Sequence, residues 1–162
     1  MLFKDCRIFH GDCLDVLKKL PNGKINLILT SPPYANQRKH TYGGIDSTKY
    51  VDWFLPISEQ LQRVLADDGS FILNIKENVK DGERDTYVLK LILALREQGW
   101  LWTEEYIWHK QNAYPGKWDY RLRDAWERLL HFTKNRHFKM FQDSVKVPIG
   151  KWIEKEQKSK KR

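Results

Sequence analysis

Two adjacent prolines end an apolar segment near the start of the chain. Residues 25–29 are largely apolar, and Thr30 and Ser31 lead from them directly into Pro32 and Pro33. Each proline fixes φ and lacks a backbone N–H, so a strand formed by the apolar segment cannot continue past Ser31. The pattern therefore predicts a strand over 25–29 that is buried on both faces of a parallel sheet and ends in a rigid turn.

An aromatic residue, Tyr34, follows this turn. The prolines leave carbonyl oxygens as open acceptors, and Tyr34 places a flat ring beside them. Acceptors next to an aromatic ring are suited to hold the amino group of a planar base, because the amine donates hydrogen bonds and the base stacks. Ser-Pro-Pro-Tyr also occurs in ordinary proline-rich loops, but its position directly after a buried strand favours a functional role.

The other apolar patterns alternate between strand and helix periodicity. Strands are predicted over 2–9, 70–75, 102–108 and 124–134, and helices over 13–20, 48–65 and 87–98, with a turn at 67–69 ending the second helix. This alternation predicts an α/β architecture with a mostly parallel sheet. Ligands of such sheets bind beyond the carboxyl ends of strands. We therefore expect Gly11-Asp12, residues 31–34 and the loop after Asn74 to line one crevice.

Size and charge limit the classes of function. The 162 residues suit one domain over 1–150 followed by a basic tail over 151–162. A net charge of +8 and 13% aromatic residues favour a polyanionic partner with bases to stack on. No signal peptide or membrane span is expected, which predicts a cytoplasmic location. Cys6 and Cys13 are predicted to be free thiols in or near strands, and no metal site is expected.

Ser31-Pro32-Pro33-Tyr34 resembles motif IV of the DNA amino-methyltransferases, whose general form is (Ser/Asp/Asn)-Pro-Pro-(Tyr/Phe/Trp). The segment Gly11-Asp12-Cys13-Leu14 ahead of a helix resembles the opening of the beta-class enzymes, in which the catalytic half precedes the cofactor half. The segments 107–110 and 123–134 are also similar to that class. The resemblance covers residues 6 to 147.

The resemblance implies a Rossmann-like S-adenosylmethionine-dependent methyltransferase sheet. It also implies transfer of a methyl group from S-adenosylmethionine to an exocyclic amine in double-stranded DNA, as in restriction–modification. A serine at the first motif position is typical of enzymes that methylate N4 of cytosine. The alternatives are an N6-adenine enzyme, a catalytically inactive fragment that binds nucleic acid, and an enzyme acting on structured RNA.

By this resemblance, the Ser31 side chain and the Pro32 carbonyl accept hydrogen bonds from the target amine, Pro33 keeps the turn rigid, and Tyr34 stacks on the extruded base. Ser31 would also contact the cofactor. Asp12 matches the acidic position that contacts the adenosine end of the cofactor. An Asp at the start of a helix also has a simpler role as an N-cap, and both interpretations stay open.

The basic segment after the motif is predicted to contact DNA phosphates through Gln37, Arg38, Lys39 and Tyr42, although a solvated polar loop has the same composition. Trp108 has two interpretations as well. It could form one wall of the base pocket, but a tryptophan in an amphipathic strand is more often part of the core.

One departure from the family pattern concerns the glycine-rich Phe-x-Gly-x-Gly motif, which holds the methionine end of the cofactor. Beta-class enzymes carry it late in the chain, and here Gly116 and Gly150 each stand alone after position 100. The sequence therefore resembles only the catalytic half of such an enzyme. We expect a second polypeptide to supply this motif and target recognition.

Overall fold

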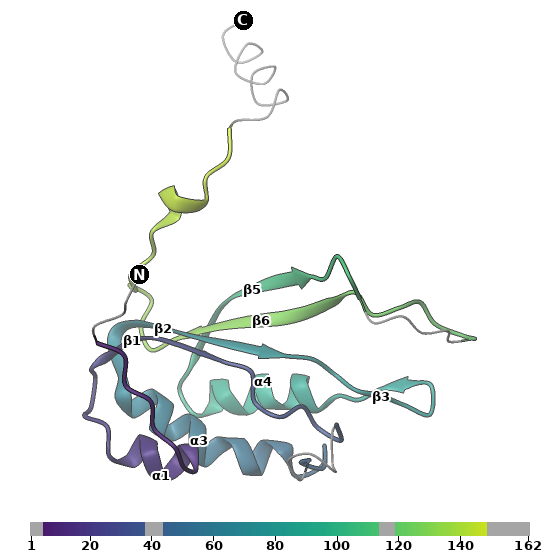
Figure 1. Ribbon diagram of the computed structural model, residues 1–162, viewed down its shortest axis with the longest axis horizontal. Helices are drawn as coiled ribbons and strands as arrows, with labels where there is room; N and C mark the ends of the chain where they lie inside the picture. The colour runs from purple at the N-terminus through teal and green to yellow at the C-terminus, as the bar shows by residue number, and fades with distance from the viewer. Residues whose placement is uncertain (1–4, 38–43, 114–118, 149–162) are drawn as a thin grey trace, which may run out of the picture.

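A four-stranded sheet carries helices on one face and forms the framework of the part of the chain that the structure describes (Figure 1). The structure is a computed structural model and describes residues 5–37, 44–113 and 119–148. Its elements are α1 (Cys13–Lys18), β1 (Ile25–Thr30), α3 (Tyr50–Val64), β2 (Leu65–Ile75), β3 (Val79–Lys80), β4 (Glu83–Arg84), α4 (Tyr87–Glu97), β5 (Leu101–His109), β6 (Trp126–Thr133) and the short 3-10 helix η1 (Gln142–Val145).

The strand order is β1-β2-β6-β5. β1 pairs with β2 in parallel, whereas β6 is antiparallel to both β2 and β5. β1, β2 and β5 thus run in one direction, as the alternation of strands and helices predicts. In the described sheet only one neighbouring pair is parallel, because the chain returns from β5 and inserts β6 between β5 and β2. The prediction of a mostly parallel sheet is therefore wrong for the pairing, and the sheet is mixed.

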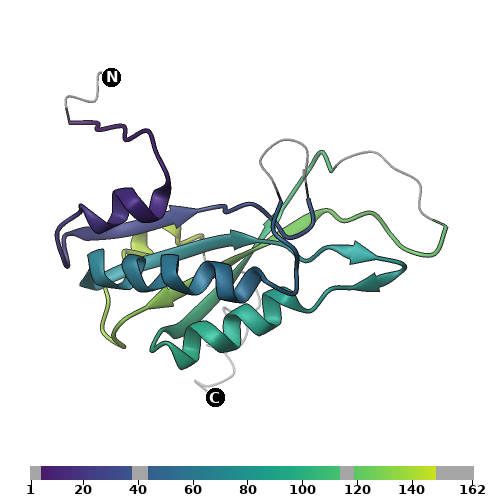
Figure 2. The same cartoon turned by 90° about the horizontal axis from the view of Figure 1, so that it is seen from below.

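The helices pack on one side of this sheet (Figure 2). α3 and α4 bury side chains three or four residues apart, so each helix directs one apolar stripe inward. These stripes meet the strand residues Phe71, Leu73, Ile75, Leu130 and Phe132. The helices predicted from periodicity are confirmed, and their observed bounds differ from the expected ones by only a few residues.

The opposite face of the sheet, here called the outer face, carries exposed apolar side chains. Leu27 and Leu29 of β1 are 59% and 66% exposed, so the prediction that this strand is buried on both faces is wrong. β1 has a neighbour on one side only and, within the described residues, nothing covers its outer face. Trp108 of β5 is 49% exposed, which contradicts its assignment to the core.

Two local predictions also fail. Residues 5–9 of the predicted first strand form no strand, and Ile8 and Phe9 are exposed, because the segment has no neighbouring strand to pair with in the described structure. The residues 67–69 form no turn after α3 but belong to β2, which begins at once. Gly69 permits this course, since a side chain there would lie 2.9 Å from the Asn26 carbonyl oxygen of β1.

Candidate active site

The Ser-Pro-Pro-Tyr turn leaves β1 at the end of the sheet where the parallel strand β2 also ends. The buried Tyr50 hydroxyl donates a hydrogen bond of 2.8 Å to the Pro33 carbonyl oxygen and fixes the turn to α3. Ser31 is exposed. The Pro32 carbonyl accepts no hydrogen bond from the residues that the structure describes. The Ser31 hydroxyl and the Pro32 carbonyl thus belong to successive residues at the tip of the strand.

The Tyr34 hydroxyl is held at its far end by residues from two other strands. It donates to Glu127 Oε2 of β6 at 2.8 Å and lies 3.2 Å from Asn74 Oδ1 of β2. The Ser31 hydroxyl donates to the Tyr34 hydroxyl at 3.3 Å. These contacts fix the ring of the motif tyrosine relative to the sheet.

Glu127 is a buried carboxylate, 7% exposed, and the Lys110 ammonium pairs with its other oxygen. Burial raises the pKa of the Glu127 carboxyl, but hydrogen bonds from Lys110 and Tyr34 outweigh that effect, so its pKa lies below the usual range. Glu127 is therefore a carboxylate at neutral pH. Lys110 also lies 5.1 Å from the centre of the Trp108 ring.

Two cavities flank the turn. The larger, about 510 Å³, lies between α1, β1 and α3, and Ser31, Pro32 and Pro33 form part of its wall together with Gly11 and Cys13. The smaller, about 210 Å³, is polar and opens beside the motif tyrosine. Its walls are formed by Tyr34, Gln37, Lys76, Glu77, Asn78, Val79, Arg121, Asp124 and Glu127. The prediction that Gly11-Asp12, residues 31–34 and the loop after Asn74 line one crevice is wrong, because the turn lies between two cavities: Gly11 and residues 31–33 border the larger, and Tyr34 and residues 76–78 border the smaller.

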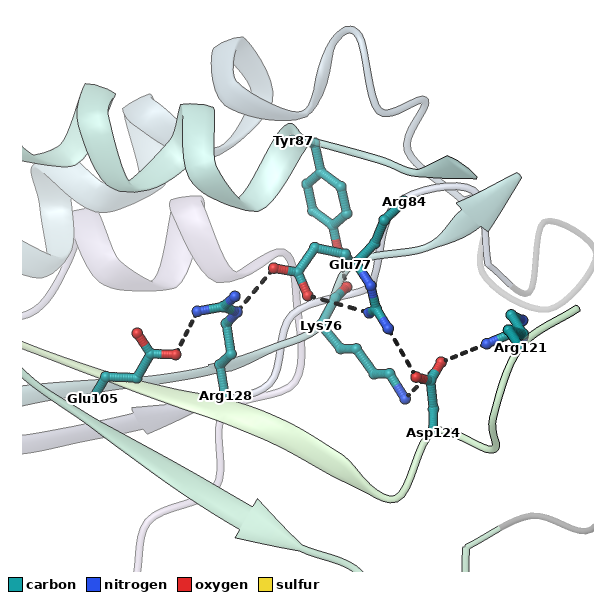
Figure 3. Close-up of polar contacts among 8 residues, drawn as sticks. All are labelled: Lys76, Glu77, Arg84, Tyr87, Glu105, Arg121, Asp124 and Arg128. Carbon is teal, nitrogen blue, oxygen red and sulfur yellow. Dashed lines mark hydrogen bonds and ion pairs between the residues drawn. The ribbon is translucent and has the colours of Figure 1, made fainter. Parts of the chain in front are cut away.

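Ion pairs frame the smaller cavity (Figure 3). Asp124 lies within 3.4 Å of Lys76 and 3.0 Å of both Arg84 and Arg121. Burial by itself raises the pKa of the Asp124 carboxyl. The three neighbouring cations lower this pKa by more than burial raises it, so it lies below the usual range. Asp124 is thus shared among three cations, of which Arg84 also pairs with Glu77.

Glu77 takes part in the same network of ion pairs and is also buried. It pairs with Arg128 at 2.8 Å, and Arg128 reaches Glu105 of β5 on its other side. These contacts connect the end of β2 with β5 and β6. The network therefore holds the walls of the cavity together across the sheet.

The other predicted site residues have different positions. Asp12 is the N-cap of α1, and its side chain accepts a hydrogen bond of 2.9 Å from the Leu14 amide, as its capping interpretation predicts. Its neighbours in sequence both border the larger cavity. Gln37 borders the smaller cavity, whereas Arg38, Lys39 and Tyr42 lie outside the described residues, as does the basic tail 151–162.

Glu127, Lys110 and Asn74 were not assigned to the site from the sequence. One signal was available: Glu127 interrupts a largely apolar strand pattern, and a charged residue buried in a sheet needs a partner. The identity of that partner could not be deduced, because Tyr34 lies 93 residues away along the chain.

Over the residues that the structure describes, no cluster of three or more metal-ligating side chains occurs, and none of the helices has the length and apolar character that a bilayer crossing requires. Cys6 and Cys13 are exposed free thiols, as expected. Cys13 is the first residue of α1 and belongs to no strand.

Comparison with known proteins gives a consistent picture. Residues 25–162 match the protein family described as DNA methylase. The Type II methyltransferase M.SfiI of Streptomyces fimbriatus is 32% identical over 166 residues, which cover 89% of this chain and 39% of that protein.

Solved structures share the fold. The PvuII DNA methyltransferase, described as cytosine-N4-specific, superposes with a TM-score of 0.73 and 26% identity over 89% of this chain and 59% of its own. A DNA modification methylase from Thermus thermophilus, solved in complex with S-adenosyl-L-methionine, gives a TM-score of 0.63 at 21% identity over 85% of this chain and 61% of its own. The chain thus spans about two fifths to three fifths of these relatives.

Proposed function

The chain belongs to the DNA methylase family, and from that premise we propose that it carries the catalytic part of a methyltransferase acting on the N4 amine of cytosine in double-stranded DNA. The observation that carries this proposal is the turn after β1. It presents the exposed Ser31 hydroxyl and the Pro32 carbonyl beside the anchored ring of Tyr34.

The proposed roles follow from the chemistry of an exocyclic amine. Its lone pair is delocalised into the ring, which makes it a weak nucleophile. Acceptors on both amine hydrogens, the Ser31 hydroxyl and the Pro32 carbonyl, favour a tetrahedral nitrogen whose lone pair is available. Pro33 keeps these acceptors in place because Tyr50 binds its carbonyl. Most of the rate enhancement would come from this alignment.

Tyr34 would stack on the base after it has left the duplex. Extrusion costs a few kcal/mol, and stacking on an aromatic ring returns about 1–3 kcal/mol. The cavity of about 210 Å³ beside the ring offers space for a base, and its polar walls suit the heteroatoms of one.

The cofactor of this family is S-adenosylmethionine, which supplies an electrophilic methyl group when bound. The cavity of about 510 Å³ on the other side of the turn is of a size that holds small-molecule ligands. We assign Ser31 and Asp12 to the cofactor. Ser31 borders this cavity, and Asp12 lies between two residues that do. Since these 162 residues contain no Phe-x-Gly-x-Gly sequence, we propose that a second polypeptide supplies the part of the site that holds the methionine end of the cofactor.

For DNA binding we propose Gln37, Arg38, Lys39 and Tyr42, which follow the turn directly. The net charge of +8 favours contact with DNA phosphates. The serine at the first motif position favours cytosine, as does the cytosine-N4 specificity in the name of the PvuII structure.

A further polypeptide segment is proposed to complete the enzyme. β1 is the edge strand of the sheet, and the outer face exposes Leu27, Leu29 and Trp108. Exposed apolar side chains gathered on one face mark a surface that a further segment can cover. The matched part is 39% of the M.SfiI methyltransferase and 59% of the PvuII structure, and we propose that a segment outside the matched part covers this face.

The test is methyl transfer from labelled S-adenosylmethionine to DNA, with detection of N4-methylcytosine and N6-methyladenine. The purified chain is assayed alone and with the polypeptide encoded beside it. N4-methylcytosine supports the proposal, N6-methyladenine moves the activity to the alternative base, and no transfer in any pairing refutes it. Ser31→Ala and Tyr34→Ala should abolish transfer, while Ser144→Ala, at an exposed serine of η1, should not.

A further inference from the structure

A chain of polar contacts connects the motif tyrosine with the far strands of the sheet. The Tyr34 hydroxyl donates to Glu127 Oε2, and the Lys110 ammonium binds Glu127 Oε1. Asn74 lies beside them, 3.2 Å from the Tyr34 hydroxyl, and its amide donates to the Arg128 carbonyl at 3.1 Å. Four separate segments thus meet at the hydroxyl end of one side chain.

Glu127 is unusual for its place in β6. It is almost fully buried, and an ionised carboxylate in such a place is costly unless it is paired and hydrogen-bonded. Both of its oxygens are occupied, one by the Lys110 ammonium and the other by the Tyr34 hydroxyl. The arrangement therefore uses a buried charge to hold a single phenol, since hydrogen bonds to charged groups are the stronger ones.

We infer that Glu127, held by Lys110, is a positioning residue that holds the Tyr34 side chain in one χ1 rotamer for stacking on the target base. This inference rests on the function proposed above. The hydroxyl lies on the axis of the Cβ–Cγ bond, so a contact there restricts rotation about the Cα–Cβ bond and leaves ring flips free. A side chain already held in the stacking rotamer loses less freedom when the base arrives.

The anchoring does not compete with stacking. The hydroxyl lies in the plane of the ring and is used by Glu127, whereas stacking needs the ring faces. Tyr34 borders the smaller cavity while its hydroxyl is bound, so both interactions fit at once.

The experiment measures the χ1 rotamer populations of Tyr34 by NMR, from three-bond couplings to its Cγ in the chain alone, labelled with ¹³C and ¹⁵N. Glu127→Gln keeps an oxygen acceptor but removes the charge, and Lys110→Met removes the cation that holds the carboxylate. The matched control is Glu77→Gln, which removes an equally buried carboxylate that pairs with Arg128 and Arg84. Exchanging a charged for a neutral hydrogen bond should raise the population of the other χ1 rotamers of Tyr34 about fivefold to tenfold.

The second measurement is methyl transfer by the completed enzyme. Glu127→Gln should lower the turnover number about fivefold to tenfold and leave the KM for S-adenosylmethionine within twofold. In a Tyr34→Phe background the same Glu127→Gln change should have no further effect, because the contact is already lost. A purely structural role of Glu127 would give equal losses in both backgrounds.

The outcomes are distinct. Unchanged χ1 populations of Tyr34 in Glu127→Gln overturn the inference, even where methyl transfer is observed. Changed χ1 populations without transfer by the unmodified protein in any pairing leave the positioning intact and refute the proposed function. If Glu127→Gln does not fold, Tyr34→Phe tests the same contact from its other end, since Glu127 and Lys110 then keep their ion pair; unchanged turnover in Tyr34→Phe overturns the inference.

Discussion

Tyr50 connects the helical core with the Ser-Pro-Pro-Tyr turn, so removal of its hydroxyl should affect both the stability of the fold and the geometry of the turn. The ring is fully buried, and the hydroxyl donates to the Pro33 carbonyl at 2.8 Å. Tyr50→Phe keeps the ring but leaves that carbonyl without its donor. The lost hydrogen bond contributes about 1 kcal/mol, and a half-buried carbonyl left unpaired adds somewhat less than the ~1–3 kcal/mol of a fully buried one.

We therefore expect Tyr50→Phe to lower the free energy of unfolding by about 1.5 kcal/mol. With a urea dependence of about 2 kcal/mol per molar, the unfolding midpoint should fall by roughly 0.7 M. Methyl transfer by the completed enzyme should fall about tenfold. The proposed acceptor is the carbonyl of Pro32, which directly precedes Pro33, and the Pro33 carbonyl has lost the hydrogen bond that fixes the turn.

Tyr87→Phe is the matched control. This tyrosine is equally buried, and its hydroxyl donates to the Lys76 carbonyl instead of the turn. It should show a similar midpoint shift with transfer within about twofold of the unmodified protein. A midpoint shift below about 0.2 M in Tyr50→Phe, or equal losses of transfer in the two variants, would refute the reasoning.

Three further predictions concern stability and DNA binding. Gly69→Ala places a methyl group 2.8 Å from Leu65 Cδ1 and should lower the free energy of unfolding by about 1–3 kcal/mol in urea titrations; an unchanged midpoint would contradict the close approach of β1 and β2. Burial lowers the pKa of His131, so stability should be full above the unfolded value of about 6.5 and decline as the pH falls through it. His131→Gln should flatten that decline between pH 7 and 5, and a wild-type midpoint constant over this range would disprove it. Replacing Arg38 and Lys39 by Gln should reduce the slope of log affinity for DNA against log salt by about 2, as measured by fluorescence anisotropy, whereas an unchanged slope excludes phosphate contacts there.

Periodicity was sufficient for the helices and for most strands. The apolar residues of α3 and α4 recur every three or four positions, and this spacing is a local property that survives in any tertiary context. Strand direction has no such local signature. An antiparallel β6 between two parallel strands depends on how the chain returns from β5, so it could not be read from the pattern of residues 126–133.

The local sequence also could not predict whether the side chains on the outer face are buried. Leu27 and Leu29 belong to an apolar run of the kind that is buried on both sides, but burial requires a second layer, and α1, α3 and α4 all pack on the other face (Figure 1). The same reason explains the exposure of Trp108.

By itself the sequence determined the turn, because two prolines after an apolar strand act through fixed φ angles and missing donors at those positions alone. Tertiary structure alone decided which groups surround Tyr34. Asn74 and Glu127 come from strands 40 and 93 residues away, and only the β2–β6 register brings them onto one face of the sheet. Contacts between distant segments depend on how strands pair, which no single segment encodes.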